Sequence, residues 1–270
     1  MNILKQNYKK ILYLFVLFCF VITVSIIGFH HEPWADEAQA WLLSRDCSLF
    51  ELVSSNLRYE GHPILWYLIL KFFIFFKLPY NFYFVIPVIF SCLGLWLFLF
   101  KTEFNLVLKL FFPFTYFIFY QYAVVARSYC LVFPALILTC IFWSRRFSNP
   151  FLFFGCLIFL FNICFYTQVL ACCIVLFYVY ELFKSKNFYQ NSKIYILAAF
   201  LFILNIMFNI YLLLPASDFP FHAYWHFKSF SFIKFFKLFA LSLFSVDDSK
   251  PSILTAISLY FLLPFLFFKI

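Results

Sequence analysis

Long apolar runs separated by short polar connections dominate this sequence and leave little choice of fold. Residues with hydrophobic side chains make up 66% of the chain and charged residues only 11%, whereas soluble domains carry about 25% charged residues. The runs predict an all-α integral membrane protein, a single polytopic domain over residues 1–270 with roughly nine or ten membrane segments. These are residues 11–29, 63–77, 82–100, 105–121, 123–142, 151–166, 168–183, 194–214, 233–246 and 252–268.

Composition excludes several classes of function. The formal charge is +9, but the basic residues are spread one to three at a time between apolar runs, which is typical of membrane loops and not of a nucleic-acid surface. We therefore expect membrane lipids and no nucleic acid as partners. The chain has four glycines, too few for the glycine-rich loops that bind nucleotide phosphates.

The basic residues also predict which face each loop occupies. If every run up to residue 142 crosses, Arg145 and Arg146 lie outside, against the positive-inside rule. If one run before Arg127 fails to cross, both arginines become cytoplasmic, and residues 215–232 become external together with residues 30–62. The run 105–121, which contains Pro113, is one candidate for such a re-entrant segment.

The first external loop, residues 30–62, is the most informative segment. Six of the eleven acidic residues lie between Glu32 and Glu60. The loop predicts two short interfacial helices, one beginning near Pro33 and one capped by Ser48. Trp34, Ala38, Trp41 and Leu42 are expected to share an apolar face on the membrane surface, and Gly61 allows the turn into the next run.

Three stretches together resemble the GT-C superfamily of membrane glycosyltransferases, especially bacterial members related to protein O-mannosyltransferases. The first is WADEA at 34–38, just after the first run, where that family places an Asp or Asp-Glu motif. The second is EGHPILWY at 60–67, similar to the family's GHPPLWY stretch, and the third is YAVVARSY at 122–129, similar to its ARPY or ARSY element. The order and spacing of these three stretches carry the resemblance, which covers about residues 10–185.

The resemblance implies transfer of a sugar from a polyprenyl-phosphate-linked donor to a glycan, lipid or protein acceptor on the outer face of the bacterial cytoplasmic membrane. It implies Asp36 as the general base, with Glu37 assisting it or binding the acceptor. Substrate-binding residues are implied at Arg58, Tyr59, Glu60, His62, Arg127 and Tyr129. Arginine donates well to phosphate oxygens, and Arg127 is an ionisable residue in an apolar stretch.

Cofactors and alternative functions stay open at this point. Some relatives use a divalent cation, but His30 and His31 are adjacent and cannot easily both face one ion, so we assign no metal ligand. His222 and His226 fit an interfacial loop better than a metal site. The alternatives are a polytopic transporter or lipid flippase, and an inactive accessory subunit that keeps the fold. Most members of the superfamily are longer, which favours a truncated or minimal form.

Overall fold

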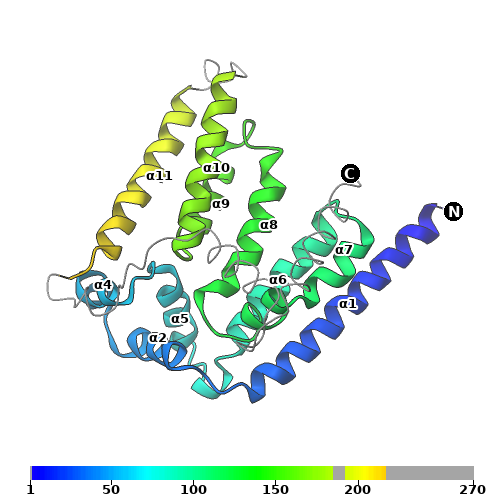
Figure 1. Cartoon of the computed structure of the whole chain (residues 1–270), viewed down its shortest axis with the longest axis horizontal. Helices are drawn as coiled ribbons and strands as arrows, with labels where there is room; N and C mark the ends of the chain where they lie inside the picture. The colour runs from blue at the N-terminus through cyan, green and yellow to red at the C-terminus, as the bar shows by residue number, and fades with distance from the viewer. Residues whose placement is uncertain (1, 185–191, 217–270) are drawn as a thin grey trace, which may run out of the picture. The chain divides into compact units, whose positions relative to one another are not determined.

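The computed structural model describes residues 2–184 and 192–216, and in these ranges the chain forms helices and no strands (Figure 1). The predicted all-helical class is confirmed for this part. The predicted segments 233–246 and 252–268 lie outside the described residues, as does nearly all of the predicted loop 215–232. In order, the helices are α1 (Asn2–His30), α2 (Ala35–Asp46), α3 (Leu49–Glu51), η1 (Leu52–Asn56), α4 (Leu57–Glu60), α5 (Leu65–Phe75), η2 (Tyr80–Phe82), α6 (Val85–Lys101), α7 (Leu106–Phe111), η3 (Phe112–Phe114), η4 (Phe117–Gln121), η5 (Ser128–Leu131), α8 (Val132–Trp143), α9 (Pro150–Phe161), α10 (Phe165–Lys184) and α11 (Ser192–Leu213).

Among the described residues, four helices are long and apolar enough to cross a membrane by length and composition. They are Asn7–His30, Tyr80–Lys101, Phe165–Lys184 and Lys193–Leu213. They match the predicted runs 11–29, 82–100, 168–183 and 194–214. The other described runs form shorter or interrupted helices, so the predicted number of segments is larger than the number of long apolar helices.

The run 63–77 forms a helix that is too short for the predicted crossing. Its helix α5 has 11 residues, about 16 Å at 1.5 Å per residue, whereas a hydrocarbon core is about 30 Å thick. Midway along it, Lys71 Nζ donates a hydrogen bond to the carbonyl of Cys47 in the loop. Beyond it, the ring of Tyr80 packs 5.7 Å from that of Trp41. The chain therefore returns to the loop after α5.

The run 105–121, predicted as a candidate re-entrant segment, follows α1 in the same direction as three short helices. At its start, Lys109 Nζ lies 5.0 Å from the ring centre of Tyr13. At its end, Tyr120 packs 6.1 Å from His31, just past the last residue of α1. Helix α7 ends at Phe111, two residues before Pro113 of η3, which lacks the N–H that a continuous helix needs. The run 105–121 thus lies along α1. The run that returns to the first loop is instead 63–77, which contains α5.

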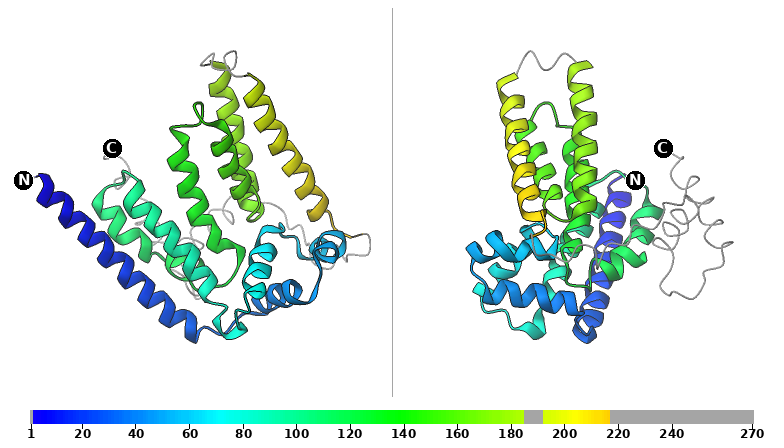
Figure 2. Two further views of the ribbon diagram at one scale, coloured as in Figure 1. Left: turned by 180° about the vertical axis from the view of Figure 1, so that it is seen from behind. Right: turned by 60° about the vertical axis from the view of Figure 1, so that its left-hand side comes forward.

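Helices α10 and α11 both pack against α9 (Figure 2). Near the N-terminal end of α11, the Tyr195 hydroxyl donates to the carbonyl of Phe147, in the turn that follows Arg145 and Arg146. Beyond its C-terminal end, Arg58 Nε donates to the carbonyl of Leu214. The turn with the two arginines and the loop helix α4 therefore lie at opposite ends of α11.

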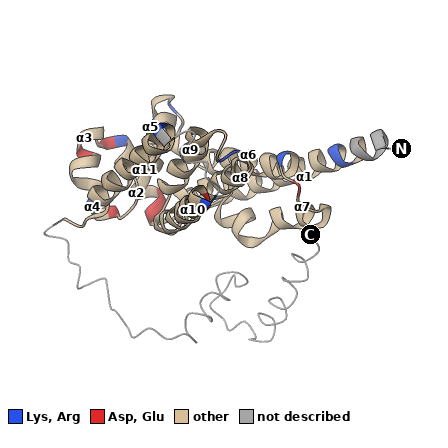
Figure 3. Cartoon of the chain, turned by 90° about the horizontal axis from the view of Figure 1, so that it is seen from above, with Lys and Arg blue, Asp and Glu red and all other residues tan. Residues whose placement is uncertain are grey.

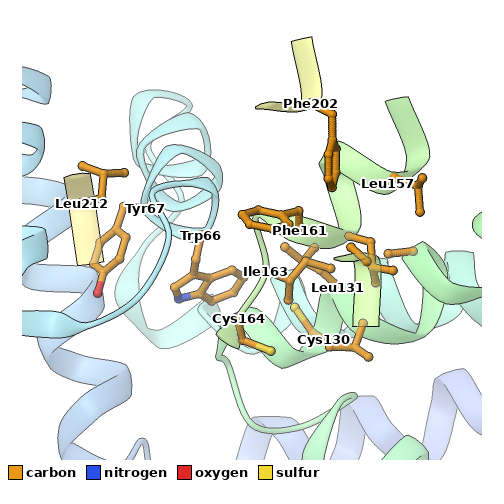
Figure 4. Close-up of a cluster of buried hydrophobic side chains, with 14 of the residues drawn as sticks. Trp66, Tyr67, Cys130, Leu131, Leu157, Phe161, Ile163, Cys164, Phe202 and Leu212 are labelled. Atoms are coloured by element: carbon orange, nitrogen blue, oxygen red, sulfur yellow. The ribbon is translucent and has the colours of Figure 1, made fainter. Parts of the chain in front are cut away.

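A buried cluster connects the loop to the helices behind it. Trp66 and Tyr67 at the start of α5 are 4% and 2% exposed. They belong to one buried cluster with Cys130 and Leu131 of η5 and Cys164 before α10, part of which is drawn in Figure 4. Trp41 of α2 belongs to the same cluster. Trp41 was expected on the membrane surface, but it is buried within the protein, where its ring centre lies 5.0 Å from that of Tyr83.

Candidate functional site

The loop helices and the segment before η5 enclose a pocket of about 230 Å³. It is lined by Asp36, Ala40, Glu60, His62, Trp66, Tyr67, Arg127 and Ser128. These residues come from α2, from the α4–α5 region and from residues 127–128, which are distant in sequence. Most of the acidic residues of the described chain lie on α2, α3 and α4, where Figure 3 marks them in red.

Two of the lining residues, Asp36 and Arg127, form an ion pair. The distance from Asp36 Oδ2 to Arg127 Nη1 is 2.7 Å. The two side chains keep 44% and 26% of their surface exposed, so solvent and a ligand can reach both. Asp36 lies in the first turn of α2, where the helix dipole favours a carboxylate. Arg127 lies in an extended conformation just before η5.

The second carboxylate of the pocket is Glu60, at the end of α4. It accepts hydrogen bonds from Gln39 Nε2 at 2.5 Å and from the Tyr67 hydroxyl at 3.3 Å. Burial raises the pKa of Glu60, and these two hydrogen bonds and Arg127 only partly offset that effect. A carboxyl with a raised pKa can exchange a proton closer to neutral pH than an exposed one.

His62 follows Glu60 after a tight turn. Gly61 between them has φ 65°, a left-handed conformation that glycine adopts without strain. His62 Nε2 lies 3.5 Å from Arg127 Nη2, which can only donate. Burial, with Arg127 nearby, lowers the pKa of His62 and favours the neutral ring. The proton then belongs on Nδ1, a buried atom without a hydrogen-bond partner among the described residues.

Two of the predicted charged site residues lie outside this pocket. The Glu37 carboxylate is 1% exposed and points away from Asp36, toward His31 and the backbone of Ala126. Arg58 donates to the carbonyls of Leu214 and Pro215, both at 3.0 Å. The structure therefore brings Asp36, Glu60, His62 and Arg127 together and does not bring Glu37 or Arg58 to them.

The two predicted tyrosines differ in their relation to the pocket. Tyr129 does not line it, but its ring lies 5.1 Å from the guanidinium carbon of Arg127, within the range of a cation–π contact. Tyr59 is 45% exposed on α4 and does not line the pocket either.

Sequence reasoning missed Gln39, Tyr67 and Ser128. Gln39 follows Asp36 by one helical turn, so the i, i+3 spacing in α2 is a signal that could have found it. Tyr67 lies within the 60–67 stretch but carries no distinguishing pattern. Within residues 2–184 and 192–216, no group of three His, Cys, Asp or Glu residues is arranged to hold a metal ion.

Comparisons with protein-family models, with curated proteins and with solved structures gave no match to this chain.

Proposed function

We propose that this chain is a membrane glycosyltransferase that uses a polyprenyl-phosphate-linked sugar as donor, and that the 230 Å³ pocket is its active site. The convergence of Asp36, Glu60, His62 and Arg127 on that pocket carries the proposal. Such a reaction needs a carboxylate for the acceptor hydroxyl and cations or N–H donors for the departing phosphate. In the pocket, Asp36 supplies the carboxylate and Arg127 supplies the cationic N–H donors, and the two side chains form one ion pair.

Each residue then has a role in one displacement. The acceptor oxygen forms a bond to the anomeric carbon while the bond from that carbon to the phosphate oxygen breaks. The hydroxyl proton passes to the Asp36 carboxylate, and the polyprenyl phosphate leaves with the bonding electron pair. Arg127 stabilises the charge on the phosphate through N–H groups that Asp36 does not occupy. His62 Nδ1–H and Glu60 serve as hydrogen-bonding groups for the sugar.

The position of the pocket suits a donor that is anchored in lipid. Its walls include α2, which follows the end of the candidate span Asn7–His30, and the α4–α5 turn, near which Arg58 donates to Leu214 at the end of the candidate span Lys193–Leu213. A phosphate at headgroup depth would lie level with such ends. Arg145 and Arg146 lie at the other end of α11, so the positive-inside rule favours an extracytoplasmic pocket.

Loss of the Asp36 carboxylate is the direct test. Membranes containing the native chain should release polyprenyl phosphate from at least one of a panel of polyprenyl-phosphate sugars. Asp36→Asn should lower that rate by about 100-fold or more without changing the protein level. Asp46→Asn is the matched control, because Asp46 is an exposed carboxylate on the same helix that pairs with Arg45. Unchanged turnover in Asp36→Asn, or no release by the native chain, contradicts the proposal.

A further inference from the structure

The other acid of the 36–37 pair lies in a different environment from Asp36. Glu37 is 1% exposed, and its carboxylate forms hydrogen bonds with two backbone N–H groups and one histidine ring. Ala126 N–H donates to Oε1 at 2.6 Å, Trp34 N–H donates to Oε2 at 2.8 Å, and His31 Nε2 lies 3.0 Å from Oε2. A buried carboxylate with such partners is fixed in place.

A second pocket beside Glu37 offers an alternative role, which the hydrogen bonds do not favour. It has a volume of about 310 Å³, and its lining residues include Glu37, His31, Tyr83 and Ala126. The Glu37 oxygens are already occupied, and the Tyr83 hydroxyl donates to the carbonyl of Ala126 at 2.8 Å. These polar groups are satisfied within the protein, so they do not require a ligand.

The peptide units on both sides of Ala126 are therefore fixed. Its N–H donates to Glu37 from α2, and its carbonyl accepts from Tyr83, just before α6. The carbonyl of Ala126 belongs to the peptide bond that joins it to Arg127. Any shift of this peptide bond moves the Arg127 guanidinium relative to Asp36, which lies next to Glu37 on α2.

We infer that Glu37 is a positioning residue, which fixes the backbone at Ala126 and thereby sets the Arg127 guanidinium against the Asp36 carboxylate. The consequence for sugar transfer rests on the proposed function, whereas the structural coupling does not. Glu37 acts through Arg127 and does not enter the pocket. Its substitution should accordingly have little further effect once Arg127 is gone.

A double-mutant cycle separates this role from a general contribution to stability. We would compare the native chain, Glu37→Gln, Arg127→Ala and the double variant by thermal unfolding in detergent. The two reductions in melting temperature should not add, and the double variant should melt close to the less stable single variant. Glu181→Gln is the control partner, because Glu181 pairs with Arg146 at 2.7 Å on other helices. Its effect should add to that of Arg127→Ala.

Sugar transfer provides the second measurement. Glu37→Gln should lower turnover by about 10-fold or more, with less than about a twofold further loss in the Arg127→Ala background. Tyr83→Phe, which removes only the hydroxyl bound to Ala126, should lower turnover in the same direction while the protein remains folded. It thus keeps the test usable if Glu37→Gln fails to fold.

The outcomes are distinguishable. Additive reductions in melting temperature, or native turnover in Tyr83→Phe, overturn the positioning role. If the native chain shows no sugar transfer but the reductions in melting temperature are non-additive, the proposed function fails and the positioning role stands.

Discussion

The Asp36 carboxylate and the Arg127 guanidinium meet at 2.7 Å, and their neighbours in sequence meet as well, because the N–H of Ala126 donates to Glu37 at 2.6 Å. Two consecutive residues of α2 thus contact two consecutive residues of the segment before η5. The first contact is partly exposed and lines the pocket, whereas the second is buried. Under the proposed function, one acidic dipeptide would thus supply both the general base and the residue that positions Arg127.

Arg127→Lys should weaken the site although it keeps the positive charge. A lysine can pair with Asp36, but it cannot also direct a second fixed N–H toward His62, as the planar guanidinium does. Hydrogen bonds to charged groups contribute about 1.5–3 kcal/mol, so we expect turnover on a polyprenyl-phosphate sugar to fall by about 10- to 100-fold. Steady-state kinetics in membranes would measure this change.

The control for that variant is Arg146→Lys, in the ion pair with Glu181, which should leave turnover near native. Equal turnover in Arg127→Lys and the native chain would remove Arg127 from phosphate binding.

Glu60→Gln should stabilise the folded chain at neutral pH. Burial raises the pKa of Glu60 above its ordinary value of 4.5, so ionisation of this group opposes folding. The opposing effect is absent below about pH 4.5 and grows as the pH rises through the folded-state pKa. The difference in melting temperature between Glu60→Gln and the native chain should therefore be positive at pH 7 and shrink as the pH approaches 4.5. A difference that does not change with pH would contradict this assignment.

His62 should make the chain sensitive to acid over a different range. Its pKa is lowered from 6.5, mainly by burial, so the unfolded chain binds the proton first. The stability that neutral His62 provides is complete above pH 6.5 and is lost as the pH falls through the folded-state pKa. Unfolding midpoints recorded between pH 7 and 5 should fall more steeply for the native chain than for His62→Gln. Parallel profiles would show that His62 is accessible to protons in the fold.

Gly61→Ala should destabilise the chain through its backbone alone. Gly61 has φ +65°, and nothing lies within 4 Å of an added Cβ, so the expected cost is the left-handed conformation, about 1 kcal/mol. Gly155→Ala is matched, because nothing lies within 4 Å of its added Cβ either. Gly155 lies within α9, where alanine is favoured over glycine. Thermal unfolding should move in opposite directions for the two variants, and a similar reduction in both would contradict the backbone explanation.

The sequence predicted the local structure of the loop well, because local rules determine it. Ser48 and Glu51 form the expected capping box, with Ser48 N–H donating to Glu51 at 2.6 Å. Gly61 makes the expected turn. The meeting of Asp36, His62 and Arg127 was expected only through a family resemblance, since no local rule brings such distant residues together.

The sequence could not show which way neighbouring side chains face. Asp36 and Glu37 are adjacent acidic residues that the sequence does not distinguish. Asp36 lines a pocket, whereas Glu37 is buried because its hydrogen-bond partners come from outside α2. The run containing α5 is as apolar as a crossing helix, and its contact from Lys71 to Cys47 is tertiary. Hydropathy measures transfer from water and does not distinguish lipid from protein as the apolar surrounding.

Arg58 caps the carbonyl groups just beyond the C-terminus of α11 with two hydrogen bonds, and in the chain it precedes Glu60 and His62 by only a few residues. A candidate membrane helix is thus joined by hydrogen bonds to the short stretch that supplies Glu60 and His62 to the pocket. A change in the tilt of α11, as bilayer thickness varies, would be transmitted through Arg58 to Glu60 and His62. We therefore expect the geometry of this pocket to depend on lipid composition.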